Sequence, residues 1–240
     1  MDRAKIKNPN RLSHADILRF QPRTRGRETP KEAKSLPQLA EVFAGSGDAA
    51  AWGFALAQLP TGAEVLWVQD RLSGLEMGRP SGAGLKRYGA DPARFTLVRT
   101  KNAKEALWAM EEGLKCTTLG AVIGEITGNP KALDFTATKR LAMRAERAGV
   151  PVILLRIGGQ RSLSAARRRW AVEALPSVRH RFDPKAPGAP RWQAELFRGR
   201  DMRPGTWEAG YEPKAHRLNL SAPLRHPEVA EAQVRAANTL

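Results

Sequence analysis

Alternation between apolar runs and helical patterns is the feature that most constrains the fold of this 240-residue chain. Apolar runs predict buried strands at residues 64–69, 95–99, 121–126 and 152–157. Helical patterns lie around and between them, at residues 49–58, 102–115 and 136–148. Strands that alternate with helices are typical of βαβ units, and right-handed crossovers then give a wound parallel sheet. We therefore expect an α/β domain with a four-strand parallel core.

Two of these helices carry start and stop signals. Asn102 followed by Glu105 forms a capping box, which satisfies backbone N–H groups at a helix start. Asp134 or Thr136 can cap the next helix, and Gly149 favours its end because glycine readily adopts a left-handed conformation. Both helices are thus expected to act as crossover connections of the sheet.

The C-terminal part has a different pattern. Residues 191–198 (RWQAELFR) alternate polar and apolar side chains, and RDMRPGTWEAGYEP follows, which together predict an antiparallel strand pair at one sheet edge. Strong hydrophobic patterning is lost beyond Pro213. We therefore divide the chain into a basic N-terminal arm at 1–35, a core domain at 36–212 and a C-terminal tail at 213–240.

Positive charge is concentrated in two segments. The chain has 40 Lys and Arg against 24 Asp and Glu, a formal net charge of +16. Residues 1–31 hold nine basic and three acidic residues, and residues 156–203 hold twelve basic and four acidic residues. Because lysine and arginine neutralise phosphates, these segments favour DNA or RNA as a partner. The alternative is a solvated basic surface that only reflects arginine-rich codon usage.

The chain has a single cysteine, and cysteine usage indicates the cellular compartment of a protein. Cys116 cannot form an internal disulfide, and its place between a helix and a strand favours a buried structural thiol. No N-terminal apolar run resembles a signal peptide or a membrane span. We expect a cytoplasmic protein without a membrane partner.

The first expected helix follows a glycine-rich loop, Gly45, Ser46, Gly47, Asp48 and Ala49. A working phosphate loop needs an opening glycine, a closing Gly-Lys pair and a hydroxyl residue for magnesium. With Gly47 as the last glycine, Asp48 replaces the lysine and Ala49 the hydroxyl residue. Val42 then replaces the opening glycine. The Asp48 carboxylate would repel a triphosphate, so we expect a degenerate loop, a helix-capping turn and no cofactor.

Other catalytic sets are weak. Asp70 and Glu125 lie on or at the ends of expected parallel strands, where α/β proteins usually place their sites. They are either remnants of carboxylates that activate water and position magnesium, or structural caps and surface contacts. Four histidines, spread along the sequence, give no metal-ligand spacing: His14, His180, His216 and His226.

Several phrases together resemble one protein family. In order, these are QDRLSGLE, GLKRYGADPARFTLVRTKNAKEALWAMEEGL, ATKRLAMRAERAGVPVILLR, ARRRWAVEALPS and PRWQAELFRGRDMRPGTW. They are similar to the ImuA family of RecA-like bacterial mutagenesis proteins, over about residues 36–210. The resemblance implies a RecA-like, mainly parallel sheet flanked by helices, with an antiparallel C-terminal edge.

The resemblance also implies a function. Members of this family work in damage-induced translesion synthesis, within the SOS response, beside ImuB and an error-prone DnaE-type polymerase. ImuB is itself a catalytically inactive relative of Y-family polymerases. The resemblance therefore implies a non-catalytic adaptor between these proteins and DNA, expected to be single-stranded, in the nucleoid region of the cytoplasm.

A DNA-binding loop is expected after the strand at 152–157, where recombinases place one. That segment contains Arg161 and leads to the run Arg167, Arg168, Arg169 and Trp170. Arginine side chains can hold phosphates, and a tryptophan can stack on a base. In the alternative interpretation, Trp170 packs in the core and the arginines are only solvated.

Three functions stay open on the sequence alone. The first is an adaptor without ATPase activity, which the residues around Asp48 favour. The second is a divergent ATPase or recombinase regulator that binds nucleotide through an unusual loop. In the third, the chain caps or inhibits RecA filaments, which makes RecA a further candidate partner.

Overall fold

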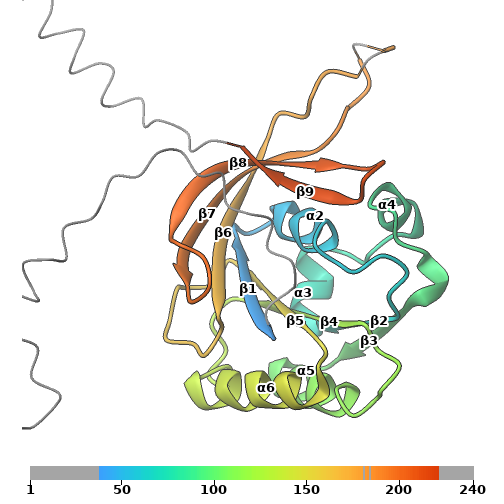
Figure 1. The fold of residues 1–240 in the computed structure, drawn as a ribbon. Helices are drawn as coiled ribbons and strands as arrows, with labels where there is room; N and C mark the ends of the chain where they lie inside the picture. Colours follow the sequence, from blue (N-terminus) through green and yellow to red (C-terminus); the bar gives the residue numbers. More distant parts are fainter. Residues whose placement is uncertain (1–37, 181, 184, 222–240) are drawn as a thin grey trace, which may run out of the picture. The chain divides into compact units, whose positions relative to one another are not determined.

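The computed structural model describes residues 38–180, 182–183 and 185–221, which include most of the expected core domain. Within these residues a single nine-stranded sheet has the strand order β3-β2-β4-β5-β1-β6-β7-β8-β9 (Figure 1). The expected N-terminal arm, and the tail beyond residue 221, lie outside the described residues.

The elements follow one another along the chain in the expected alternation. The strands are β1 (Leu39–Ala44), β2 (Val65–Asp70), β3 (Phe95–Thr100), β4 (Ala121–Thr127), β5 (Val152–Ile157), β6 (Arg168–Leu175), β7 (Arg191–Gly199), β8 (Gly205–Glu212) and β9 (Arg217–Leu220). The helices are α2 (Ala50–Leu56), α3 (Arg71–Glu76), α4 (Gly82–Arg87), α5 (Ala103–Gly113) and α6 (Phe135–Ala148), with a 3-10 turn η1 (Pro92–Arg94).

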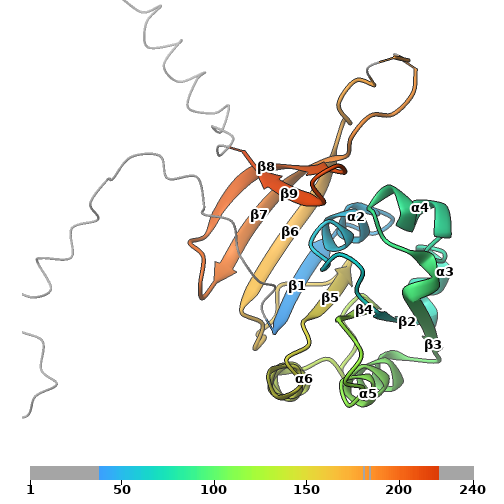
Figure 2. The ribbon, with the colours of Figure 1, turned by 45° about the vertical axis from the view of Figure 1, so that its right-hand side comes forward.

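The sheet has a parallel part and an antiparallel part. Strands β3, β2, β4, β5, β1 and β6 are parallel neighbours, whereas β7, β8 and β9 continue the sheet in antiparallel pairs. Helices α2 and α4 contribute to the hydrophobic core on one face, and α5 and α6 to the core on the other (Figure 2). The expected mainly parallel α/β sheet with an antiparallel C-terminal edge is confirmed.

The capping signals act as the sequence predicts. The Glu105 backbone N–H donates to Asn102 Oδ1 at 3.0 Å, and the Ala137 N–H donates to Asp134 Oδ1 at 2.7 Å. Gly149 ends α6 with a φ of 66°. These local interactions fix where α5 and α6 begin and end, and so fix the two crossovers.

Three strands lie where the sequence analysis expects none: β1, β6 and β9. With β1 and β6 the parallel part has six strands instead of the expected four. β6 begins at Arg168, and its arginines are paired with carboxylates rather than exposed to solvent. β9 pairs with β8 inside the segment assigned to the tail. It has only four residues, and its side chains are exposed or half-buried, so its polar and apolar alternation is too short to reveal a strand.

Aromatic side chains join α2 to the antiparallel part. The Phe54 ring lies 5.3 Å from the Trp170 ring and 5.9 Å from the Trp192 ring, measured between centroids. Gly53 allows this approach, because a Cβ there would lie 2.3 Å from the Tyr88 hydroxyl oxygen and 2.8 Å from the Trp192 ring. Trp170 is therefore a core residue, which confirms the alternative interpretation for this side chain.

The expected burial of the single cysteine is wrong. Cys116 is exposed, since it lies in the turn after α5, and its Sγ is 3.2 Å from Thr118 Oγ1. The Thr118 contacts lower the pKa of this thiol. No helix in the described part of the chain is long and apolar enough to cross a bilayer.

Replacing Gly53 by alanine tests the contact between α2 and the aromatic cluster. Overpacking typically costs about 1–3 kcal/mol, which exceeds the roughly 1 kcal/mol that alanine gains over glycine in a helix. We expect Gly53→Ala to lower the urea midpoint of unfolding. Gly45→Ala is the matched control, because its added Cβ meets nothing within 4 Å. Equal midpoints for the two variants would contradict the tight approach of α2.

Candidate functional site

The segment at the phosphate-loop position is occupied by sheet rather than by an open loop. Strand β1 continues to Ala44, and Val42 is paired with Leu155 of β5 on one side and Trp170 of β6 on the other. Val42 is the residue that stands where a phosphate loop would open. The backbone at that position therefore lies inside the sheet, with a paired strand on each side.

The remaining loop, residues 45–49, is closed by Asp48. The Ala50 N–H donates to Asp48 Oδ1 at 2.8 Å, and the Ala174 N–H donates to Asp48 Oδ2 at 3.4 Å. Gly47 supplies the turn with a φ of 75°, a conformation that favours glycine. Asp48 thus ties the start of α2 to β6, while the N-cap residue Ala49 makes no side-chain capping bond.

The loop after β5 packs against the loop after β1. The Gly158 N–H donates to the Ala44 carbonyl at 2.8 Å. A Cβ on Gly158 would lie 2.5 Å from Ser46 Oγ, and the φ of 61° at this position also favours glycine. This contact brings Ser46 against the backbone of the segment where DNA binding is expected.

The two acidic residues singled out in the sequence have different environments. Asp70 ends β2 and caps α3, where it accepts a hydrogen bond from the Ser73 N–H at 2.8 Å. Glu125 is fully buried on β4, where Trp67 Nε1 and Gln69 Nε2 donate to its Oε2 at 3.1 Å each. Burial raises the pKa of Glu125 to about 7, against the lowering effect of these hydrogen bonds. The neutral carboxyl group is therefore favoured at this position below about pH 7.

Three of the DNA-binding candidates lie inside the protein. Arg168, Arg169 and Trp170 are all buried on β6. Arg168 Nε donates to Asp201 Oδ1 at 3.0 Å, and this bond lowers the pKa of Asp201. The expected placement of these three residues in a flexible DNA-binding loop is therefore corrected, because their side chains are used in ion pairs and in the core.

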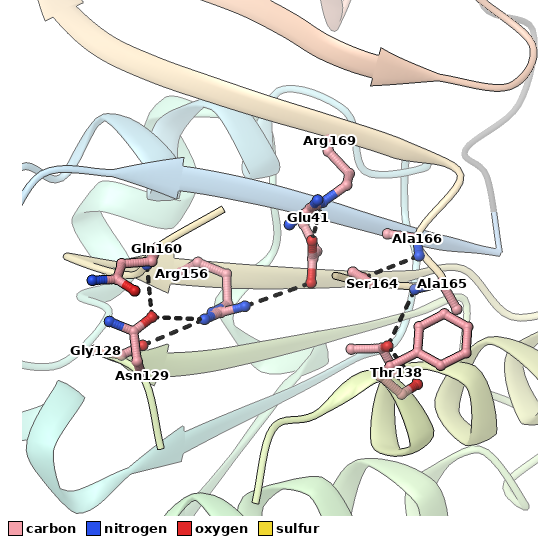
Figure 3. A network of polar contacts seen from close by, with 11 residues as sticks. Glu41, Gly128, Asn129, Thr138, Arg156, Gln160, Ser164, Ala165, Ala166 and Arg169 are labelled. Atoms are coloured by element: carbon pink, nitrogen blue, oxygen red, sulfur yellow. Dashed lines mark hydrogen bonds and ion pairs between the residues drawn. The ribbon is translucent and has the colours of Figure 1, made fainter. Parts of the chain in front are cut away.

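Arg169 belongs to a buried charge cluster centred on Glu41 (Figure 3). Glu41 Oε2 lies 2.5 Å from Arg169 Nε, and Glu41 Oε1 lies 3.7 Å from Arg156 Nη1. Arg156 Nη2 also donates to the Gly128 carbonyl and to Asn129 Oδ1, at 3.5 and 3.4 Å. Burial lowers the pKa of Arg156, although Glu41 favours its charged form. The sequence analysis missed Glu41 and Arg156, although each is a charged residue inside an apolar strand, which is a readable signal.

The other two candidate arginines remain accessible. Arg161 lies 2.5 Å from Glu195 Oε2 through its Nη2, with its guanidinium carbon 4.3 Å from the centroid of the Phe197 ring. Arg167 Nη2 lies 3.3 Å from Glu146 Oε1. Both side chains are about half exposed, so they are the members of the predicted set that a solvent-borne ligand can reach.

The described histidines form no catalytic or metal site. His216 bridges Tyr211 Oη at 2.9 Å and the Leu59 carbonyl at 2.7 Å, a structural position. Within the described part of the chain, no group of three or more His, Cys, Asp and Glu side chains is placed to hold a metal ion.

Glu125 makes stability depend on pH. Its folded pKa of about 7 exceeds the ordinary value of 4.5, so between these pH values the folded protein holds a proton that the unfolded chain releases. Stability from this group therefore falls as pH rises from about 4.5 to about 7. Glu125→Gln keeps an acceptor but cannot ionise. We expect it to gain up to about 3 kcal/mol relative to the parent between pH 5 and 8, measured by urea unfolding.

The exposed Glu76→Gln is the control for that pH series, and its stability difference from the parent should stay flat. A flat difference for Glu125→Gln as well would contradict the raised pKa of Glu125.

Comparisons with known proteins agree with this arrangement. No protein-family model matches the chain. The crystal structure of the RadB recombinase superposes with a TM-score of 0.52 at 17% identity, covering 75% of this chain and 90% of that chain, which shows the RecA-like fold. Protein ImuA from two strains of Caulobacter vibrioides is 34% identical over 187 residues, covering 72% of this chain and 71% of each relative. The chain therefore belongs to the ImuA family of RecA-like DNA-damage mutagenesis proteins.

Proposed function

We propose that this protein is a non-catalytic accessory factor of error-prone translesion DNA synthesis. In this role it connects an ImuB-type protein, an error-prone DnaE-type polymerase and DNA. Family membership supports the pathway. The observation that carries the non-catalytic part is the position of Val42, paired within the sheet on both sides where a phosphate loop would have to open.

The energetics of the loop after β1 support this proposal. A phosphate cradle would require backbone hydrogen bonds around Val42 to break on both sides, at about 0.5–1.5 kcal/mol for each bond. A bound triphosphate would then face the Asp48 carboxylate instead of a lysine. The α2 helix has only seven residues, so it contributes little dipole at its start. The first two effects oppose nucleotide binding, and the short helix does little to offset them.

DNA contact is assigned to Arg161 and Arg167, on the segment between β5 and β6. Their partners Glu195 and Glu146 are themselves exposed, with side chains at 40% and 59% of full accessibility. Such surface ion pairs are worth about 0–1 kcal/mol, so a phosphate group can replace either carboxylate at little cost. Arg168 and Arg169 are themselves buried, paired with the half-exposed Asp201 and the buried Glu41, and keep their structural role.

Titration calorimetry with ATP and magnesium tests the loss of nucleotide binding. We expect no binding heat for the full chain up to millimolar ATP. We expect the same result for the double variant Asp48→Lys/Ala49→Thr, because the strand pairing of Val42 persists when the lysine and hydroxyl are restored. A micromolar Kd for the unaltered protein would overturn the proposal and favour a divergent ATP-binding recombinase regulator.

Salt-dependent binding of a single-stranded oligonucleotide tests the DNA contact. Loss of two phosphate contacts in Arg161→Ala/Arg167→Ala should reduce the slope of log affinity against log salt by about 1.4, or ~0.7 for each contact. By contrast, Arg168→Ala/Arg169→Ala should lower the free energy of unfolding by about 3–5 kcal/mol, because a buried carboxylate loses its partner. Arg71→Ala/Lys86→Ala removes the same charge elsewhere and should leave the slope nearly unchanged. An unchanged slope for the first pair would remove the DNA role from this segment.

A further inference from the structure

A groove between α5 and α6 has no part in the site described above. Its volume is about 760 Å³, and the two helices lie side by side in both ribbon views (Figures 1 and 2). Apolar side chains of Leu114 and Met143 line it. Five basic residues stand around them: Lys115, Lys139, Arg140, Arg144 and Arg147. The groove thus combines an apolar lining with a cationic rim.

The basic residues of the rim outnumber the carboxylates that pair with them. The buried carboxylate of Glu111 lies 2.6 Å from Arg140 Nε and 3.1 Å from Arg144 Nε, so one acid serves two arginines. Lys139 and Arg147 are exposed and make no ion pair within the described residues. The groove therefore presents a surplus of cations for which the described part of the chain supplies no acids.

Exposed apolar side chains lie on both helices that form the groove. Met143 is 47% exposed in the groove, and Trp108 is 64% exposed on α5, one turn before Glu111. Methionine fills irregular contacts and is common at adaptable binding surfaces. Tryptophan is enriched among the residues that dominate protein interfaces. Neither side chain serves the core, so both are available to a partner.

The spacing of the cations indicates the shape of the occupant. Arg140, Arg144 and Arg147 are four and three residues apart, so they form one stripe along α6. The groove follows α6 from residue 136 to residue 148, about 18 Å at a rise of 1.5 Å per residue. That length fits roughly three turns of a second helix laid beside α6.

We propose that the α5–α6 groove docks an acidic amphipathic helix of a partner protein. Leucine-type side chains of that helix would enter the lining formed by Leu114 and Met143, and carboxylates along its flanks would meet the arginine stripe. A nucleic acid fits less well, because the lining is aliphatic and offers no aromatic platform on which bases could stack. The inference goes beyond the proposed adaptor role and does not depend on DNA binding.

The test uses the full chain and a labelled helical peptide built from Leu, Glu and Ala. Its leucines follow an i, i+3, i+7 pattern with glutamates on both flanks, and binding is followed by fluorescence anisotropy. We expect Lys139→Glu/Arg147→Glu and Met143→Glu each to weaken binding at least tenfold. Arg79→Glu/Lys86→Glu makes the same charge change as the first variant away from the groove and should weaken it less than twofold. A permuted peptide of equal composition should bind at least tenfold more weakly than the patterned one.

The outcomes separate the alternatives. No binding of the patterned peptide, or equal loss in the groove and control variants, would overturn the proposal and leave only nonspecific attraction to a basic protein. A thymidine oligonucleotide measured in parallel should be weakened by the groove variants much less than the patterned peptide is. If they weaken the oligonucleotide and spare the peptide, the groove is a nucleic-acid surface. A failure of the Arg161 and Arg167 test leaves this proposal standing.

Discussion

Strand β1 carries hydrogen bonds to both neighbours, β5 and β6, and this double pairing is the constraint on which the rest of the structure depends. All six of its residues are buried. On one side it pairs with β5 of the parallel part. On the other it pairs with β6, which is also parallel to it and leads into the antiparallel strands β7 to β9. A phosphate loop would have to release the last residues of this strand. The same pairing that joins the two parts of the sheet thus supports the proposal that the loop after β1 binds no nucleotide.

The buried charges help to set the register of that junction. Glu41 stands directly opposite Arg169 in the pairing of β1 with β6. A slip by one residue would turn Glu41 toward the aromatic core on the other face and away from Arg156 and Arg169. Buried ion pairs often add little net stability, yet breaking one is costly because the remaining charge has lost its partner. The Glu41 cluster therefore disfavours wrong registers between β1 and β6 more than it stabilises the correct register.

How far the sequence predicts this fold depends on whether the signal is local. The four expected strands and the helix caps at Asn102 and Asp134 depend on nearby residues. Their predicted positions agree with the structure within a residue or two. β6 was missed because the environment of Arg168 and Arg169 is set by Asp201 and Glu41, which are distant along the chain. Composition alone therefore favoured a solvent-exposed arginine loop.

The loop residues 45–49 show the same division between local and distant signals. The absence of lysine and hydroxyl residues was visible directly, whereas the continuation of β1 to Ala44 depends on pairing with β5 and β6. For the same reason net charge was a poor guide to the position of a site. Of the four arginines proposed for DNA, burial leaves only Arg161 and Arg167 accessible.

The sequence carried no signal for the groove between α5 and α6. Its stripe of cations on α6 looks like the solvated face of any helix until α5 is placed beside it.

Helix α6 links the two proposed binding surfaces. Arg167 reaches its Glu146, while the groove lies along its side toward α5. Within about 8–10 Å, charges are only partly screened at physiological salt, so an acidic helix in the groove would reduce the positive potential that Arg167 offers to a phosphate. Such coupling is reciprocal, so DNA would weaken the acidic partner by the same factor. Under the proposed loss of nucleotide binding, ATP would not act as a switch, and competition of this kind across α6 would let the partners of this protein regulate one another.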